Sequence, residues 1–91
     1  MINTDRHNYT EMVAIDVSSA DQIFDYNETL RAMLVSGAGD LDVTDIEGNR
    51  DVILFETAAN GGVYPFLLPL QIKTVHMTTT TITNSSLIGL R

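Results

Sequence analysis

Residues that favour turns interrupt this chain roughly every eight to twelve positions, so no regular element can be long. The clearest breaks, rich in Gly, Asn, Ser and Asp, fall at 36–40, 47–49, 60–62 and 84–86. Residues 20–35 are the best helical candidate, but the run 25–27 interrupts their apolar pattern. Short strands with this spacing predict an all-β chain, folded as a small antiparallel β-sandwich or a jelly-roll-like barrel of roughly six to eight strands.

Alternation of apolar and polar residues identifies the clearest strands. Residues 41–45 alternate, and the connection 47–49 joins them to the apolar segment 51–56, so these segments predict a hairpin. Residues 70–77 also alternate, which predicts a half-buried strand with two faces. One face would carry Leu70, Ile72, Thr74 and His76, and the other Gln71, Lys73, Val75 and Met77. The remaining apolar segments are 12–17, 30–35, 66–68 (an edge or a connection, because prolines flank it), 82–83 and 87–90.

The chain is expected to form one domain behind a short arm. Residues 1–11 are polar and lack periodicity, so we interpret them as an extended N-terminal arm. Residues 12–91 then make a single β-sandwich domain, since a chain of 91 residues supports one hydrophobic core. The first residues do not combine a basic region with an apolar one, and no apolar run approaches ~20 residues. We expect no secretion signal, no membrane-spanning segment and assembly in a cytoplasm.

The charge balance limits the partners that the chain can bind. Five Lys and Arg residues against twelve Asp and Glu give a net charge of -7, and the basic residues are scattered singly. Such a surface cannot neutralise a run of phosphates, so we expect no nucleic-acid binding and no attraction to anionic membranes. The absence of cysteine excludes disulfides and thiol chemistry.

The sequence offers no convincing set of catalytic or metal-binding residues. The histidines, His7 and His76, lack metal-site spacing, and His76 is the one plausible general base. The acids between 40 and 51 resemble a calcium loop, but an EF-hand starting at Asp40 needs glycine at its sixth position and glutamate at its twelfth. The chain has aspartate at both, so Asp40 and Asp42 are interpreted as the solvent face of a strand. We expect no enzymatic activity, no cofactor and no metal.

Two segments are more apolar than is usual for the surface of a small domain. The strand 52–55 is apolar on both faces, and the stretch 63–70 is apolar although it contains two prolines. These residues either fill the small core or form a subunit interface, where aromatic residues are enriched. The candidate interface residues are Val63, Tyr64, Phe66, Leu67, Leu68 and Leu70.

The order of several short motifs resembles the small spike-base capsid proteins of tailed phages and gene transfer agents. The motifs are an apolar strand at 30–35 running into Gly37-Ala38-Gly39-Asp40-Leu41, a hairpin from Val43 to Phe55, the loop Asn60-Gly61-Gly62, the stretch Leu68-Pro69-Leu70-Gln71-Ile72-Lys73-Thr74-Val75, the threonine-rich segment 78–83 and the terminal strand Leu87-Ile88-Gly89-Leu90. The resemblance covers roughly residues 12–91. The chain departs from the family in a longer loop at 57–64 and in the lack of a glycine around 76–78.

The resemblance implies a virion structural protein without catalytic residues. The expected role is a capsid-attached spike or fibre base, or a decoration subunit, on the virion surface. Its partners would be further copies of itself, in a ring such as a trimer or pentamer, the major capsid protein and a fibre or spike protein. Two alternatives are another phage head–tail adaptor or tail structural protein, and a monomeric binding module for carbohydrate or calcium.

Overall fold

The structure is a computed structural model that describes residues 9–56 and 64–91. Within these residues the regular structure consists of eight short strands and the 3-10 turn η3 (Asn84–Ser86). In chain order the strands are β1 (Met12–Ala14), β2 (Gln22–Ile23), β3 (Ala32–Val35), β4 (Gly39–Asp45), β5 (Arg50–Phe55), β6 (Phe66–Leu68), β7 (Ile72–Val75) and β8 (Leu87–Leu90). None of the described residues forms a helix long and apolar enough to cross a lipid bilayer.

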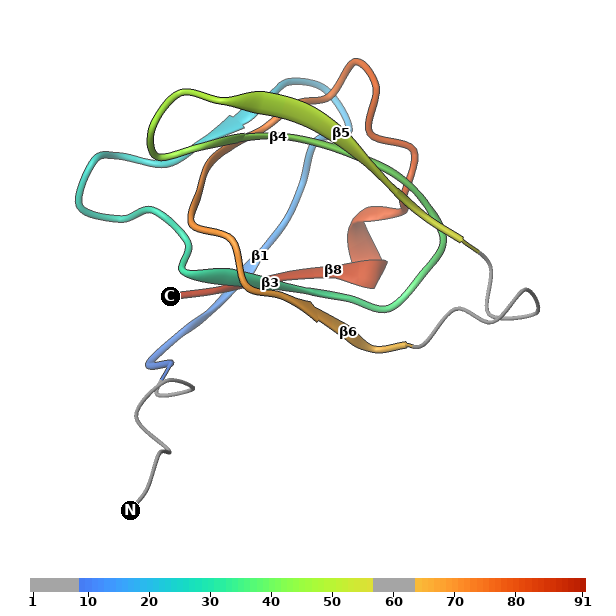
Figure 1. Cartoon of the computed structure of the whole chain (residues 1–91), viewed down its shortest axis with the longest axis horizontal. Helices are drawn as coiled ribbons and strands as arrows, with labels where there is room; N and C mark the ends of the chain where they lie inside the picture. The colour runs from blue at the N-terminus through green and yellow to red at the C-terminus, as the bar shows by residue number, and fades with distance from the viewer. Residues whose placement is uncertain (1–8, 57–63) are drawn as a thin grey trace.

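The strands form two antiparallel four-stranded sheets, packed face to face as a sandwich (Figure 1). The first sheet has the order β1-β8-β3-β6 and the second has the order β2-β7-β4-β5. Strands 1 and 8, 2 and 7, 3 and 6, and 4 and 5 are neighbours, as in a long hairpin rolled up into a jelly roll. The predicted all-β sandwich is therefore confirmed, and its two sheets stay open rather than closing into a barrel.

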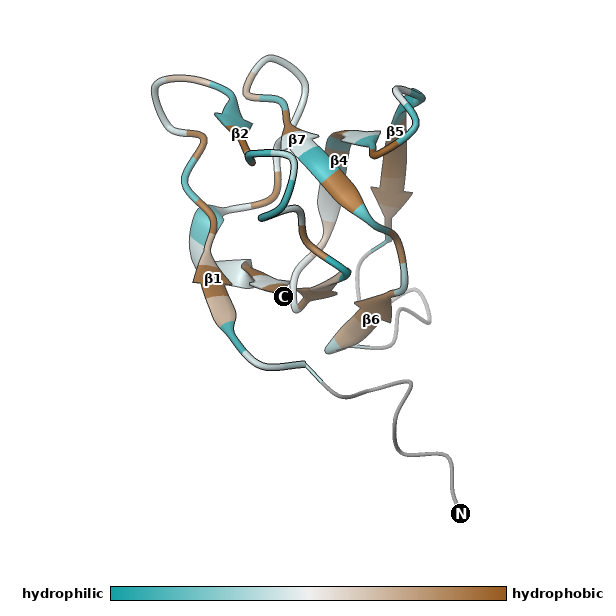
Figure 2. Ribbon diagram, turned by 90° about the vertical axis from the view of Figure 1, so that its left-hand side faces the viewer, coloured by the Kyte–Doolittle hydropathy of each residue, from teal (hydrophilic) through white to brown (hydrophobic). Residues whose placement is uncertain are grey.

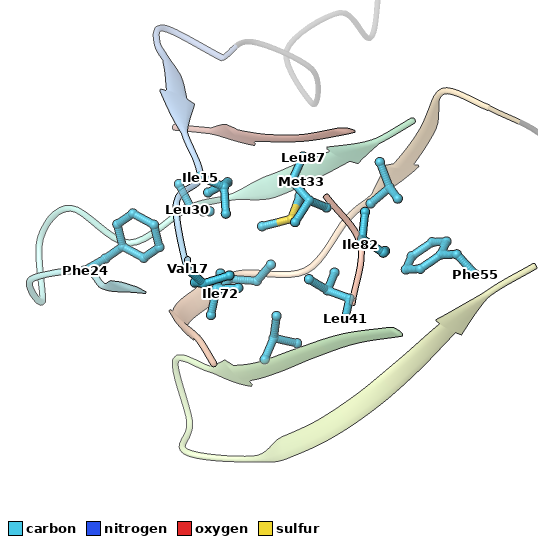
Figure 3. Packing of buried hydrophobic residues seen from close by; sticks show 13 residues of the cluster. Ile15, Val17, Phe24, Leu30, Met33, Leu41, Phe55, Ile72, Ile82 and Leu87 are labelled. Atoms are coloured by element: carbon cyan, nitrogen blue, oxygen red, sulfur yellow. The ribbon is translucent and has the colours of Figure 1, made fainter. Parts of the chain in front are cut away.

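The core lies between the two sheets and draws on both (Figure 3). Met33 and Leu87 point inward from the first sheet, and Leu41 and Ile72 point inward from the second; all four are almost completely buried. The remaining buried members are Ile15, Val17, Phe24, Leu30, Val35, Val43, Phe55, Val75 and Ile82. Fully burying a side chain of this size stabilises a fold by roughly 1.5–3 kcal/mol, so this cluster is the main source of cohesion.

The predicted hairpin of 41–45 and 51–56 is confirmed as β4 and β5, paired from Gly39↔Phe55 to Thr44↔Arg50. The Asp45 carboxylate closes the turn by accepting hydrogen bonds from the backbone N–H groups of Glu47 and Asn49, each at 2.9 Å. Gly48 adopts a positive φ of 92°, which favours glycine because it has no Cβ.

The strict alternation predicted for 70–77 is wrong at Lys73. Thr44 pairs with Thr74 and Asp45 pairs with Ile72, so Lys73 is the extra residue of a β-bulge. The bulge places Ile72 and Val75 on the same inward face, and both are fully buried. Val75 therefore belongs to the core, not to the face that the alternation assigned to it.

The last residues of the predicted arm lie against the end of the chain. The backbone N–H groups of Thr10 and Glu11 donate to the Arg91 carbonyl, and the Arg91 N–H donates back to Glu11. The Arg91 side chain also pairs with the Glu11 carboxylate at 3.0 Å. These bonds extend the β1–β8 pairing by two residues, so 10–11 belong structurally to the first sheet; residues 1–8 of the expected arm lie outside the described residues.

Candidate functional site

On the outer side of the first sheet, facing away from the core, the outward residues of the four strands are all apolar. Register places Met12, Leu90 and Ala32 side by side in one row, and in the next row Ala14, Ile88, Leu34 and Leu67. Their inward neighbours Val13, Met33 and Leu68 contact the core, so alternation turns these two rows outward. We call this surface the apolar outer face; its seven residues are Met12, Ala14, Ala32, Leu34, Leu67, Ile88 and Leu90.

Four strands without a polar outward side chain are unusual for an antiparallel sandwich, whose outward residues are normally polar. The second sheet follows the usual rule in β4, where Asp40, Asp42 and Thr44 point outward opposite buried Leu41 and Val43. Figure 2 shows the apolar colouring of β1 and β6 at the two edges of the first sheet. On the apolar outer face Met12 remains 74% exposed, whereas Ala32 is buried and Leu34 and Leu67 are half-buried.

A second apolar surface lies where the sandwich opens between the edge strands β5 and β6. Phe55 and Phe66 meet there edge to face, with ring centroids 5.6 Å apart. They line a shallow cleft of about 330 Å³, which we call the apolar cleft. Its lining residues are Ile53, Leu54, Phe55, Glu56, Tyr64, Phe66 and Leu68.

The structure divides the predicted interface residues between the core and the two surfaces. Tyr64, Leu68 and Leu70 are partly buried and pack on the core. Phe66 is 42% exposed at the apolar cleft, and Leu67 belongs to the apolar outer face. Val63 lies outside the described residues. Strand 52–55 divides similarly, because Phe55 is buried whereas Val52 and Leu54 remain 42% and 66% exposed.

The prediction that Asp42 faces solvent is wrong, because its side chain is only 1% exposed. Arg50 covers it from β5, with Nε donating to Oδ1 at 3.0 Å and Nη2 donating to Oδ2 at 2.9 Å. The hydrogen bonds from Arg50 hold the pKa of the Asp42 carboxyl below its ordinary value of 3.8, against the opposing effect of burial. The pair is a structural clamp across the β4–β5 hairpin.

His76 lies between a carboxylate and a hydroxyl on the outer side of the second sheet. Its Nδ1 lies 3.1 Å from Asp21 Oδ2, and its Nε2 lies 2.7 Å from Thr44 Oγ1. A carboxylate accepts only, so in the neutral ring Nδ1 carries the proton and Nε2 accepts from the Thr44 hydroxyl. Asp21 also accepts the backbone N–H of Met77 at 2.8 Å. Hydrogen bonds from Met77 and His76 lower the pKa of Asp21.

This arrangement has the order of a hydrolytic triad, yet neither Thr44 nor His76 lines the apolar cleft where a substrate could be held. Its evident effect is to tie the segment before β2 to the residues after β7. The Asp51 carboxylate likewise has a local partner, since it accepts the Val52 N–H at 2.8 Å. Within 9–56 and 64–91, no group of three or more His, Cys, Asp or Glu side chains is placed to hold a metal ion.

The apolar outer face was not identified from the sequence, although a signal was present. Each of the strands β1, β3, β6 and β8 is a continuous apolar run, the pattern of a strand covered on both faces. Only the strand order brings these separate runs into one sheet and turns one of their faces outward.

No protein-family model, no curated protein and no solved structure matches the chain.

Proposed function

We propose that this protein is a virion structural protein: a capsid-attached base of a spike or fibre, or a decoration subunit, that assembles with copies of itself. The observation that carries the proposal is the apolar outer face. Seven outward side chains drawn from all four strands of one sheet include no group that needs water. Apolar side chains gathered on the outward side of a sheet favour burial against another protein.

The size of the apolar outer face supports a protein interface. Four strands about 4.8 Å apart and three to four residues long cover on the order of 200–270 Å². A standard interface buries about 800 Å² on each partner, with an apolar core inside a polar rim. The apolar outer face is about a quarter to a third of that area, so it would form only the centre of an interface. Neighbouring polar residues such as Glu11 and Arg91 would supply part of the rim.

Two further features favour a structural role on a particle. The jelly-roll strand order recurs in viral capsid domains, which supports the assignment by analogy of fold alone. The motif order described above provides the resemblance to spike-base proteins. Under this proposal the apolar outer face binds neighbouring copies, and the apolar cleft binds an apolar side chain of the major capsid protein or of the fibre or spike protein.

Under this proposal the protein has no catalytic activity. The Asp21–His76–Thr44 arrangement then only stabilises the fold, and a panel of p-nitrophenyl esters is the direct test. We expect the same slow background hydrolysis with the wild-type chain and with His76→Ala. A rate above buffer that the substitution abolishes would assign a catalytic role to His76.

Self-assembly is tested with substitutions that leave the core intact. Met12→Asp places a charge on the apolar outer face at a position that is 74% exposed, so the monomer should fold normally. Ile23→Asp is the matched control, because Ile23 is 68% exposed on an edge strand of the other sheet. Native mass spectrometry should show oligomers for the wild type and the control, and smaller species for Met12→Asp. A monomeric wild type at high concentration would contradict self-assembly.

The location on a virion requires purified particles. Quantitative mass spectrometry should give a fixed copy number per particle, and electron cryomicroscopy should place the density on the capsid surface below a spike or fibre. Density at the neck or on the tail would instead assign a head–tail adaptor or a tail protein. Absence from purified particles would reject a virion role altogether.

A further inference from the structure

The edge strand β5 carries a pattern that is complementary to itself. It is an edge strand of the second sheet, and among residues 9–56 and 64–91 its backbone pairs only with β4. Its exposed residues include Val52 at 42% and Leu54 at 66%. Most edge strands are protected by prolines or by short length, as β6 is by Pro65 and Pro69. β5 is six residues long and contains no proline.

The hairpin fixes which backbone groups of β5 point to the free edge. Asp45 N–H donates to the Asn49 carbonyl, so these two residues form a hydrogen-bonded pair at the turn. Hydrogen-bonded and non-hydrogen-bonded pairs alternate along an antiparallel ladder. The groups of Asp51, Ile53 and Phe55 therefore point to β4, and those of Arg50, Val52 and Leu54 point outward. The Val52 N–H is indeed accepted by the Asp51 side chain, not by β4.

We propose that a second copy of this chain pairs with β5 about a two-fold axis, in a register that places Ile53 opposite Ile53 of the other copy. Residues whose backbone groups point to the free edge must lie opposite each other, because only they can form the new hydrogen bonds. This condition allows only registers in which the two-fold axis passes through a residue and not between two residues. Among these registers, the axis at Ile53 sets Val52 against Leu54 and Arg50 against Glu56 on the same outer face. Two copies would thus form two apolar pairs flanked by two ion pairs, and the second sheets would join into one continuous sheet.

Charge complementarity identifies a second copy as the occupant. Arg50 is 52% exposed on its side chain although it clamps Asp42, and Glu56 is exposed. Opposite charges directly across a strand pair stabilise pairing, and like charges oppose it. When two copies pair antiparallel, each residue of the row Arg50, Val52, Leu54, Glu56 lies opposite a residue of matching character: Arg50 opposite Glu56, and Val52 opposite Leu54. This contact uses the second sheet, so it does not rest on the capsid assignment or on the apolar outer face.

Asp51 limits the strength of the contact. Its carboxylate accepts the Val52 N–H at 2.8 Å. The second copy would need this N–H as a hydrogen-bond donor. Asp51→Ala should therefore tighten dimerisation. Glu56→Arg would set Arg opposite Arg at both ends of the contact and should weaken dimerisation about tenfold. Glu47→Arg is the control with the same change of charge, at an exposed position in the β4–β5 turn.

Cross-linking tests the register, and the chain suits it because it has no cysteine of its own. Ile53 would lie opposite Ile53 in a non-hydrogen-bonded pair about 4.5 Å apart between Cα atoms, which a disulfide can bridge. Leu54 would lie opposite Val52, so two Leu54 positions would be too far apart. Under mild oxidation, full-length Ile53→Cys should form a disulfide-linked dimer and Leu54→Cys should not.

Analytical ultracentrifugation of the Met12→Asp variant, without an added cysteine, measures dimerisation through β5. The substitution weakens assembly through the apolar outer face, so the β5 contact is observed separately. We expect a concentration-dependent dimer that Glu56→Arg weakens and Glu47→Arg retains. A monomer at every concentration overturns the proposal, as does equal cross-linking at 53 and 54 or equal weakening by Glu56→Arg and Glu47→Arg. Loss of assembly in Met12→Asp with retention of this dimer would separate the two contacts.

Discussion

Arg50 clamps the carboxylate of Asp42 with two parallel hydrogen bonds, 3.0 Å to Oδ1 and 2.9 Å to Oδ2. The two residues lie on adjacent strands, yet their burial differs sharply: the Asp42 side chain is 1% exposed and the Arg50 side chain is 52% exposed. The aspartate therefore depends on the arginine for compensation of its buried charge, whereas the arginine can still interact with water.

Removing the charge of Asp42 should destabilise the fold. Asp42→Asn keeps the shape of the side chain but removes the negative charge that pairs with Arg50, and its amide NH2 cannot accept the second hydrogen bond. The free energy of unfolding should therefore fall by about 1–3 kcal/mol. Urea denaturation followed by circular dichroism measures the change. Asp25→Asn is the control, because Asp25 is exposed. Equal stability of Asp42→Asn and the wild type would show that the clamp contributes nothing.

Acid should destabilise the protein through the same aspartates. Hydrogen bonds lower the pKa of Asp16, Asp21, Asp42 and Asp45 below the ordinary value of 3.8 in the folded chain. A carboxyl whose folded pKa is lowered stabilises the fold fully above its unfolded pKa, and this contribution is lost as the pH falls through the folded value. The melting temperature should therefore decline steeply below about pH 4.

The contribution of the clamp to this acid response can be isolated. Because Asp42→Asn has no carboxyl at this position, its melting temperature should decline less steeply than that of the wild type over the same acidic range. Melting curves from pH 2 to pH 7 (roughly the window set by these carboxyls) provide the comparison. Identical slopes would show that Asp42 does not contribute to the acid response.

Features formed by neighbouring segments of the chain could be predicted from the sequence, whereas features formed by distant segments could not. The β4–β5 hairpin could be predicted, because its two strands and its turn are contiguous. The burial of Asp42 could not, because part of its surroundings comes from Thr80, 38 positions later. The bulge at Lys73 depends on the pairing of β7 with β4, and nothing in the alternation of 70–77 reveals it. The apolar outer face similarly depends on the joining of four distant runs.

The threonine run after β7 should have unequal effects on stability from one position to the next. The chain turns at 77–79, directly after β7, and Thr80 and Thr81 then lie beside β4. The Thr80 and Thr81 hydroxyls accept the backbone N–H groups of Asp42 and Asp40, at 3.0 and 2.8 Å. These hydroxyls therefore replace the backbone acceptors that a continuous β7 would provide.

Thr80→Val keeps the volume of the side chain but leaves the partly buried Asp42 N–H without its acceptor. We expect a loss of about 1–3 kcal/mol in unfolding free energy. Thr78→Val is the matched control, since Thr78 is exposed and should tolerate the change within about 0.5 kcal/mol. Hydrogen exchange at the Asp42 amide gives a second readout, and it should accelerate in Thr80→Val alone. Equal effects of the two substitutions would refute the role of the Thr80 hydroxyl.

Gly89 lets the backbone of β8 lie directly against the core residue Leu30. An added Cβ there would lie 2.7 Å from both Cδ atoms of Leu30, which is fully buried. Gly89→Ala should therefore destabilise the protein by about 1–3 kcal/mol through overpacking.

The double substitution Leu30→Ala/Gly89→Ala separates this clash from an effect on the strand itself. Leu30→Ala alone should cost about 2–5 kcal/mol by opening a cavity. If the clash is the cause, adding Gly89→Ala to Leu30→Ala should cost little or restore stability, because the new methyl group enters that cavity. A double variant whose loss equals the sum of the two single losses would locate the cost in the β8 backbone and not in its contact with Leu30.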